Sequence, residues 1–303
     1  MTEESGAGQR VEKLSGPPGT ALLYGRAALG AIPGAALLPF VGGRGSKLPD
    51  LRLQLDEAEG GADRLAEYCR VCGFTLRDLL PATYPHLLAF PLQMRLMADG
   101  GFPFPLLGLV HLDNAVTQHR PIATRERLDL AVWAEDLRSH PKGRAFTLVA
   151  EARSEGSLVW EERGTILRRG GGSADAPAET GRQEPLSVDA PIAAEWKLGG
   201  DLGRRYGAVS GDRNPIHMHP LSARALGFPR AIAHGMWTKA RCLAQLESRV
   251  PDAFTVRTRF IKPILLPGTV AFAFEEDATG TRFAVRDSGK GTPHLEGELT
   301  PTL

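Results

Sequence analysis

Cysteine is scarce in this chain of 303 residues. Only Cys69, Cys72 and Cys242 are present, too few for a disulfide framework. Cys69 and Cys72 form a lone C-x-x-C pair without the second pair of ligands that a structural zinc site needs. We therefore expect two thiols packed on a helix near the core, and we predict a cytoplasmic location because thiols stay reduced there.

Excess charge and long uninterrupted apolar runs are also missing. The formal net charge is +1, so there is no electrostatic basis for binding nucleic acid or an anionic membrane. Residues 20–41 are apolar but contain Arg26, Pro33 and Pro39, whereas a spanning helix needs about 20 apolar residues with few interruptions. We predict no integral membrane segment and interpret 20–41 as a loop-rich arm that packs on the protein.

The order of the predicted elements occurs twice along the chain. A buried helix is predicted at 86–98 in the first half and at 232–248 in the second, because both stretches are largely apolar. Antiparallel strand candidates follow each helix. They lie at 107–117, 127–137, 144–154 and 157–168, and then at 255–261, 269–275, 281–287 and 295–299. This order predicts an α+β fold in which each sheet wraps around one central helix.

Composition divides the chain into four parts. Residues 1–16 are polar and glycine-rich, which predicts a disordered tail. Residues 170–184, GGGSADAPAETGRQE, have no hydrophobic periodicity, which predicts a linker. We expect one α+β unit at 17–169 and a second at 185–303.

A polar stretch in the second half is the strongest candidate for chemistry. Residues 210–217, SGDRNPIH, contain a carboxylate at Asp212 and an imidazole at His217, while Gly211 and Pro215 argue against a regular helix. A loop that turns at Pro215 can bring both side chains to one point. A carboxylate beside an imidazole can hold or move a proton near neutral pH, so this pair is a candidate general acid and base.

Two other interpretations of this loop stay open on the residues alone. Asp212 can cap a turn while His217 is a hydrogen-bonded core histidine, and an isolated motif slightly favours that structural role. Asp212, His217 and His219 can also act as metal ligands. A metal held by Asp and His side chains of one loop usually needs a further ligand from another part of the chain, and the sequence does not reveal one. Neither a metal site nor a cofactor is predicted.

Gly235 lies at the start of the second buried helix, in residues 231–236, AIAHGM. A helix N-terminus presents unpaired N–H groups and a partial positive charge, and glycine lets a substrate oxygen approach the backbone. The Gly235 N–H is thus a candidate oxyanion donor, with helix packing as an equally good reason for the glycine. An acid–base pair with such a donor can add water to, or remove it from, a carbon–carbon bond next to a thioester.

These residues resemble those of a known family. Residues 206–223, YGAVSGDRNPIHMHPLSA, resemble the signature of the MaoC-like, R-specific enoyl-thioester hydratases and dehydratases, and residues 232–237, IAHGMW, resemble the helix entry of that family. The family fold is the hot-dog, an antiparallel sheet wrapped around one long helix. The repeated order of elements is similar to the double hot-dog members, whose first hot-dog is non-catalytic. The resemblance therefore implies a double hot-dog with one active site, in the second half.

The resemblance also assigns roles to residues. It implies that Asp212 and His217 are the catalytic dyad, that the Gly235 N–H receives the thioester oxygen, and that Asn214 and His234 contact the substrate. The implied reaction is the reversible hydration of trans-2-enoyl thioesters, or dehydration of (3R)-3-hydroxyacyl thioesters, in fatty-acid metabolism. The expected substrate is a thioester of coenzyme A or of an acyl-carrier protein, and a homodimer of double hot-dogs is the expected assembly.

Two other functions fit the same fold. One is a non-catalytic subunit that binds acyl thioesters within a heteromeric dehydratase, although a pure binder has no need of Asp212. The other is a hot-dog thioesterase, which would release a free thiol from an acyl thioester.

Overall fold

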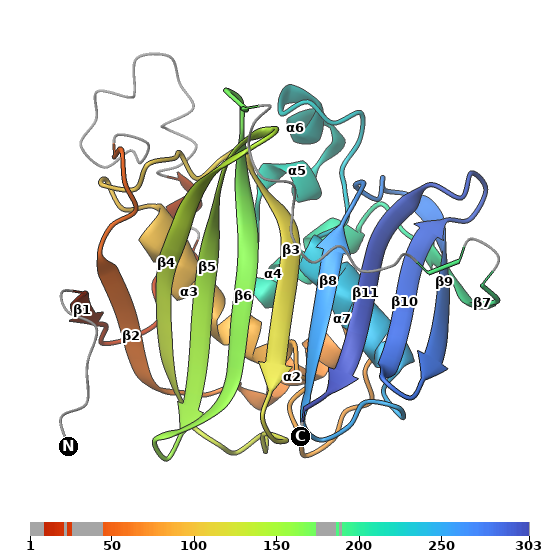
Figure 1. Ribbon diagram of the computed structural model, residues 1–303, viewed down its shortest axis with the longest axis horizontal. Helices are drawn as coiled ribbons and strands as arrows, with labels where there is room; N and C mark the ends of the chain where they lie inside the picture. Colours follow the sequence, from red (N-terminus) through yellow and green to blue (C-terminus); the bar gives the residue numbers. More distant parts are fainter. Residues whose placement is uncertain (1–8, 21–22, 26–44, 174–185, 188–189, 303) are drawn as a thin grey trace.

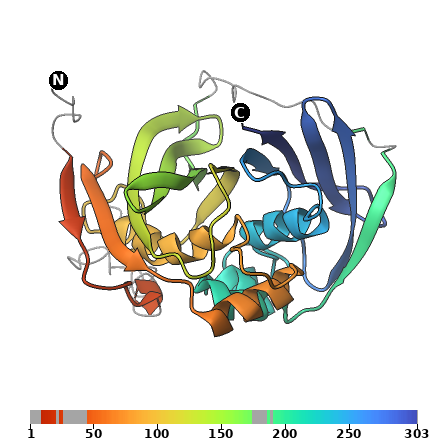
Figure 2. The same cartoon turned by 90° about the horizontal axis from the view of Figure 1, so that it is seen from below.

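The protein was analysed as a computed structural model that describes residues 9–20, 23–25, 45–173, 186–187 and 190–302. Within these ranges, eleven strands form one sheet that curves around the helices on one of its faces (Figures 1 and 2). No helix in the described part of the chain is long and apolar enough to cross a membrane.

The first half of the sheet packs on helix α3 (Tyr84–Met97), with α2 (Ala62–Cys72) preceding it. Thirteen of the fourteen residues of α3 are buried, so the prediction of a buried helix is confirmed.

The strands of the first half include a tight hairpin. Between two of them, Glu155 and Gly156 have φ angles of 51° and 79°, as a two-residue hairpin turn requires. The strands of this half are β2 (Leu51–Ala58), β3 (Leu109–Gln118), β4 (Leu128–His140), β5 (Gly143–Ser154) and β6 (Ser157–Arg169).

The second half of the sheet packs on helix α7 (Gly235–Gln245). This helix is shorter than the predicted 232–248, because the backbone of Ile232 is extended and bridges Leu265 instead. The other helices of this half are α4 (Leu202–Ser210), α5 (Pro215–Met218) and α6 (Pro220–Ala225). Its strands are β7 (Ile192–Leu198), β8 (Phe254–Phe260), β9 (Gly268–Asp277), β10 (Gly280–Asp287) and β11 (Pro293–Pro301).

The two halves meet where β3 pairs with β8. These strands run antiparallel from Asp113 opposite Arg259 to Gln118 opposite Phe254. The resulting strand order is β1-β2-β4-β5-β6-β3-β8-β11-β10-β9-β7, with α3 behind one half and α7 behind the other (Figure 1). The α+β double hot-dog prediction is therefore confirmed, with the two predicted sheets joined edge to edge into one.

The predicted disordered tail at 1–16 is wrong for part of its length. Arg10–Lys13 form strand β1, which pairs in parallel with β2. The pairing supplies hydrogen-bond partners to the edge of β2, a contact that composition does not reveal. Residues 1–8 lie outside the described residues, as do 21–22 and 26–41 of the predicted arm and 174–184 of the predicted linker. The division at 17–169 and 185–303 stays a prediction.

The expectation that Cys69 and Cys72 pack on a helix near the core is confirmed. Cys69 and Cys72 lie on α2 and Cys242 on α7, and all three are buried free thiols. Burial raises the pKa of Cys69 to about 11, so this thiol is not a reactive thiolate at neutral pH. The indole N–H of Trp237 donates to the carbonyl of Val71 at 3.0 Å, which fastens α7 to α2.

Candidate active site

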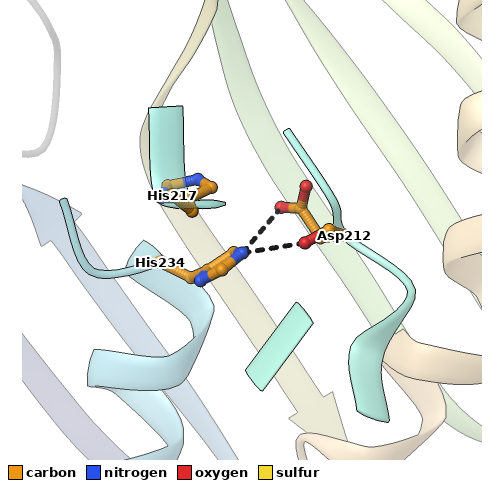
Figure 3. Close-up of side chains that lie close together, drawn as sticks. All are labelled: Asp212, His217 and His234. Atoms are coloured by element: carbon orange, nitrogen blue, oxygen red, sulfur yellow. Dashed lines mark hydrogen bonds and ion pairs between the residues drawn. The ribbon is translucent and has the colours of Figure 1, made fainter. Parts of the chain in front are cut away.

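Asp212 and His217, separated by five positions in sequence, meet at the N-terminus of α7. Asp212 lies just after α4, His217 lies in α5, and His234 immediately precedes α7. The three side chains converge (Figure 3), and one potential ligand atom from each lies within 4.8 Å of the others. The loop therefore brings the predicted pair together, and the start of α7 adds a second imidazole, that of His234.

Small residues on α4 allow the loop to fold back onto this helix. A side-chain carbon at Gly203 would lie 2.0 Å from the carbonyl oxygen of His217, and one at Gly207 would lie 2.8 Å from the carbonyl oxygen of Asp212. Gly211 ends α4 with a φ of 82°, a left-handed conformation that glycine adopts without strain. The glycines thus determine where the loop lies against the helix.

The Asp212 carboxylate is held by two hydrogen bonds to one of its oxygens. Oδ1 accepts from the hydroxyl of Tyr24 at 2.5 Å and from the backbone N–H of Asn214 at 3.1 Å. Burial alone would raise the pKa of Asp212, but the nearby imidazoles of His234 and His217 and these hydrogen bonds outweigh it and lower the pKa. Asp212 is ionised at neutral pH, and 26% of its side chain remains exposed to reactants.

The hydrogen bond of His217 determines which ring nitrogen can act as a base. Nδ1 lies 2.8 Å from the carbonyl oxygen of Ile232, which can only accept, so Nδ1 carries the proton and Nε2 keeps its lone pair. Burial lowers the pKa of this imidazole, and the charge of Asp212 only partly opposes the effect. His217 is therefore a neutral base at neutral pH, oriented by the backbone.

His234 supports both members of the pair. Its ring stacks on His217 with the ring centroids 3.6 Å apart, and its Nε2 donates to the carbonyl oxygen of Asp212 at 3.0 Å. Burial and the neighbouring His217 lower its pKa to about 3, so the ring is neutral. Its Nδ1 is buried and has no hydrogen-bond partner among the described residues.

Asn214 and Gly235 also lie at the site. The Asn214 side chain caps α5 by accepting from the N–H of Ile216 at 3.4 Å, and Gly235 is the first residue of α7. A side-chain carbon at Gly235 would lie 2.9 Å from the ring of Phe260. The predicted substrate contacts of Asn214 and His234 and the oxyanion role of Gly235 stay predictions.

The structure places a third potential metal ligand beside Asp212 and His217, which the sequence did not reveal. His219 is not in the cluster, because its exposed ring caps α6 through Nδ1, which accepts from the N–H of Leu221 at 3.2 Å. His234 supplies the third potential ligand atom instead. Its Nε2–H is bonded to a carbonyl oxygen, so that nitrogen has no free lone pair for a cation.

Tyr24 was not identified from the sequence as a site residue. It contacts Asp212 across 188 positions of the chain. It lies in the apolar arm, where neither its spacing nor its neighbours distinguish it from a packing residue.

Comparison with known proteins supports the family resemblance. The family described as "MaoC like domain" matches residues 180–297. The chain is also 37% identical over 270 residues to 3-hydroxyacyl-thioester dehydratase X of Mycobacterium tuberculosis, covering 89% of this chain and 94% of that protein. The chain belongs to the MaoC-like dehydratase family. The crystal structure of this relative, HtdX, matches our MaoC-like chain with a TM-score of 0.74 and 35% identity, over 83% of this chain and 100% of that one.

Two further relatives extend the comparison. Peroxisomal enoyl-CoA hydratase 2 of Arabidopsis thaliana is 29% identical to this MaoC-like protein over 153 residues, 46% of this chain and 48% of that protein. A Mycobacterium tuberculosis protein described as having a double hotdog fold has a TM-score of 0.53 and 14% identity, over 82% of this chain and 94% of that one. The latter similarity supports the fold alone.

Proposed function

We propose that this MaoC-like protein catalyses the reversible hydration of trans-2-enoyl thioesters, and the reverse dehydration of (3R)-3-hydroxyacyl thioesters, in fatty-acid metabolism. The observation that carries the proposal is the meeting of an ionised Asp212 with a neutral His217 at the N-terminus of α7. The family membership and the names of the dehydratase and hydratase relatives support it.

Hydration begins with a water held between the Asp212 carboxylate and Nε2 of His217. The dyad takes a proton from this water as its oxygen attacks C3 of the enoyl thioester. Negative charge moves from C2 onto the thioester oxygen, which accepts a hydrogen bond from the N–H of Gly235. The dyad then returns a proton to C2, and dehydration runs through the same groups in reverse.

The family supports an acyl thioester as the substrate. We propose that the carrier of this substrate is coenzyme A or an acyl-carrier protein, and that Asn214 and His234 contact the substrate. We also propose that two chains form a homodimer of double hot-dogs and that the protein acts in the cytoplasm. We also propose that only the second half, 185–303, carries the reaction. In the first half, Glu162 and His86 do form a carboxylate–imidazole pair, but Glu162 is 2% exposed and other core side chains bond to its oxygens.

Replacing a member of the dyad tests the mechanism. Asp212→Asn and His217→Ala should each lower the turnover number by about 10²–10⁴, because each removes a group that transfers a proton. The loss of enoyl absorbance on hydration of a series of enoyl-coenzyme A thioesters measures the effect. His219→Asn is the matched control, since His219 is an exposed histidine two positions from His217, and it should retain turnover. Near-normal turnover in both dyad variants would contradict the assignment.

The alternative functions are separated by the same preparations. A thioesterase would release free thiol from saturated acyl-coenzyme A, which a thiol reagent detects, and a binding subunit would leave enoyl absorbance unchanged. A metal-dependent reaction would be lost on incubation with a chelator and restored by a divalent cation. We expect hydration that a chelator does not abolish, without thiol release.

A further inference from the structure

The two oxygens of the Asp212 carboxylate have different surroundings. Oδ1 accepts from the hydroxyl of Tyr24 at 2.5 Å and from the N–H of Asn214 at 3.1 Å. Within the part of the chain that the structure describes, Oδ2 makes no hydrogen bond and lies 3.8 Å from Nε2 of His234. The carboxylate is therefore fixed through Oδ1, while Oδ2 remains available to a reacting oxygen.

Packing of the neighbouring residues holds Tyr24 in this place. Leu23 is 5% exposed and belongs to the main hydrophobic core. Thr20 approaches Gly211, where an added side-chain carbon would lie 3.5 Å from the Thr20 hydroxyl oxygen. A cleft of about 430 Å³ lies beside this contact, lined by Thr20 on one side and by Gly211 and Arg213 on the other. The neighbours of Tyr24 are thus packed on the core at Leu23 and lie close to the end of α4 at Thr20.

The geometry is that of a donor that orients a base without reacting itself. A carboxylate can rotate about its Cβ–Cγ bond, and two donors on one oxygen oppose that rotation. A hydrogen bond to an ionised group is about twice as strong as one between neutral groups. Burial, and then the charge of Asp212, raise the pKa of Tyr24 far above its ordinary value, so the phenol keeps its proton and remains a donor throughout the reaction.

We propose that Tyr24 is a positioning residue of the active site, which directs Oδ2 of Asp212 toward the water or 3-hydroxyl group that reacts. The inference rests on the proposed function, because it assigns Asp212 as the base. It also means that the site of the second hot-dog is completed by a residue from the arm at the start of the first half.

A double-mutant cycle between Tyr24 and Asp212 tests the inference. Tyr24→Phe should lower kcat by about 10- to 100-fold in the otherwise unchanged protein, the fold-change expected for one lost hydrogen bond to a charged group. In an Asp212→Asn background the same change should lower kcat by less than about threefold, because the carboxylate that Tyr24 orients is gone. The KM should change little, and the acid limb of the kcat profile should move to higher pH because the ionised carboxylate loses a donor.

Tyr84→Phe is the matched control. It also removes one phenol hydroxyl with a hydrogen bond, here to the carbonyl of Gly60, in the core of the first half. We expect it to lower the melting temperature without moving the pH profile. A Tyr24→Phe variant with unchanged or increased kcat would overturn the inference, as would an equal loss in both backgrounds, which marks a purely structural role.

The result for Asp212→Asn alone distinguishes the two proposals. If this variant is fully active, Asp212 is not the base, and both the proposed function of the dyad and the role of Tyr24 are wrong. If Asp212→Asn is inactive while Tyr24→Phe behaves like the unchanged protein, only the role of Tyr24 is wrong.

Discussion

Charge on the two imidazoles decides whether the site can accept a proton. His217 and His234 are 8% and 3% exposed, and burial lowers the pKa of both below the ordinary 6.5. A buried neutral imidazole retains a free lone pair in mildly acidic solution, where an exposed one is protonated. Burial therefore extends the range of pH in which His217 can act as a base.

We expect the acid limb of kcat/KM to lie below pH 6.5. The active form has an ionised Asp212 and a neutral His217, and the pKa of each is lowered, so protonation stops the reaction only at a pH below the ordinary value of histidine. Initial rates with an enoyl thioester between about pH 4 and 9 measure the limb. An acid limb at or above 6.5 would contradict the assignment.

The same shifts affect stability, and this limits the assay. The pKa of His234 is about 3 in the folded chain and ordinarily 6.5, so between these values the unfolded chain binds a proton that the folded chain does not. His234 therefore does not lower the free energy of unfolding above pH 6.5. As the pH falls below 6.5, protonation of His234 in the unfolded chain lowers this free energy progressively. Circular dichroism at each pH separates loss of the base from loss of the fold.

At the scale of elements, the site depends on how the N-terminus of α7 meets β8. Gly235 begins the helix and lies against Phe260 at the end of the strand, where a side-chain carbon would lie 2.9 to 3.1 Å from three ring atoms. Such contacts are too close for an unshifted ring. Glycine therefore lets the end of β8 pack beside the first turn of α7, whose first N–H groups are the proposed donors to the substrate.

Gly235→Ala should lower kcat by about 10- to 100-fold, because the methyl group displaces Phe260 and obstructs the donor to the thioester oxygen. Steady-state kinetics measures the effect. The double variant Gly235→Ala/Phe260→Leu should regain part of the lost kcat, because the smaller leucine leaves space for the added methyl group. Gly289→Ala is the control, since a side-chain carbon there would meet no atom closer than 3.7 Å. Unchanged kcat in Gly235→Ala would argue that this glycine serves only helix packing.

At the scale of the whole molecule, a buried ion network crosses the junction of the two halves. Lys239 of α7 is 0% exposed, and burial lowers its pKa to about 7. Its Nζ donates to the side-chain and backbone oxygens of Asn114 at 2.5 and 3.1 Å and to the carbonyl of Val256 at 3.1 Å. The Asn114 amide in turn donates to Glu162 at 2.7 Å, and Glu162 binds His86 of α3 at 2.9 Å. The two central helices are thus connected through β3 and β6.

Lys239→Met should lower the free energy of unfolding by about 3–5 kcal/mol, because it removes the lysine from a buried network and leaves the side-chain oxygen of Asn114 without a donor. Thermal unfolding followed by calorimetry measures the change. We expect one transition before and after the substitution, since the sheet is continuous through β3 and β8. Lys262→Met, at an exposed position, should have almost no effect. Two separate transitions in the unchanged protein would contradict the single cooperative unit.

Features that depend on neighbouring residues were predictable from the sequence. Apolar runs predicted α3 and the hairpin strands, because burial periodicity is a property of consecutive residues. Asp212 and His217 could be paired because they lie five positions apart. The expectation that Pro215 argues against a helix is wrong, because Pro215 occupies the first turn of the short helix α5, where its missing N–H costs no hydrogen bond. The family resemblance rests on the same stretch, so fold and candidate dyad were predicted together.

Contacts across long sequence separations were decided by the tertiary structure alone. The hydrogen bond from Tyr24 to Asp212 spans 188 positions and that from Lys239 to Asn114 spans 125, and neither leaves a local pattern in the sequence. Folding also decided that His234, and not His219, lies beside Asp212 and His217. The sequence by itself places the acid–base groups Asp212 and His217 close together along the chain. Which donors orient them depends on how α7, the arm and the joined sheet pack. Hydrogen bonds require short distances between donor and acceptor, and for residues far apart in sequence only folding produces them.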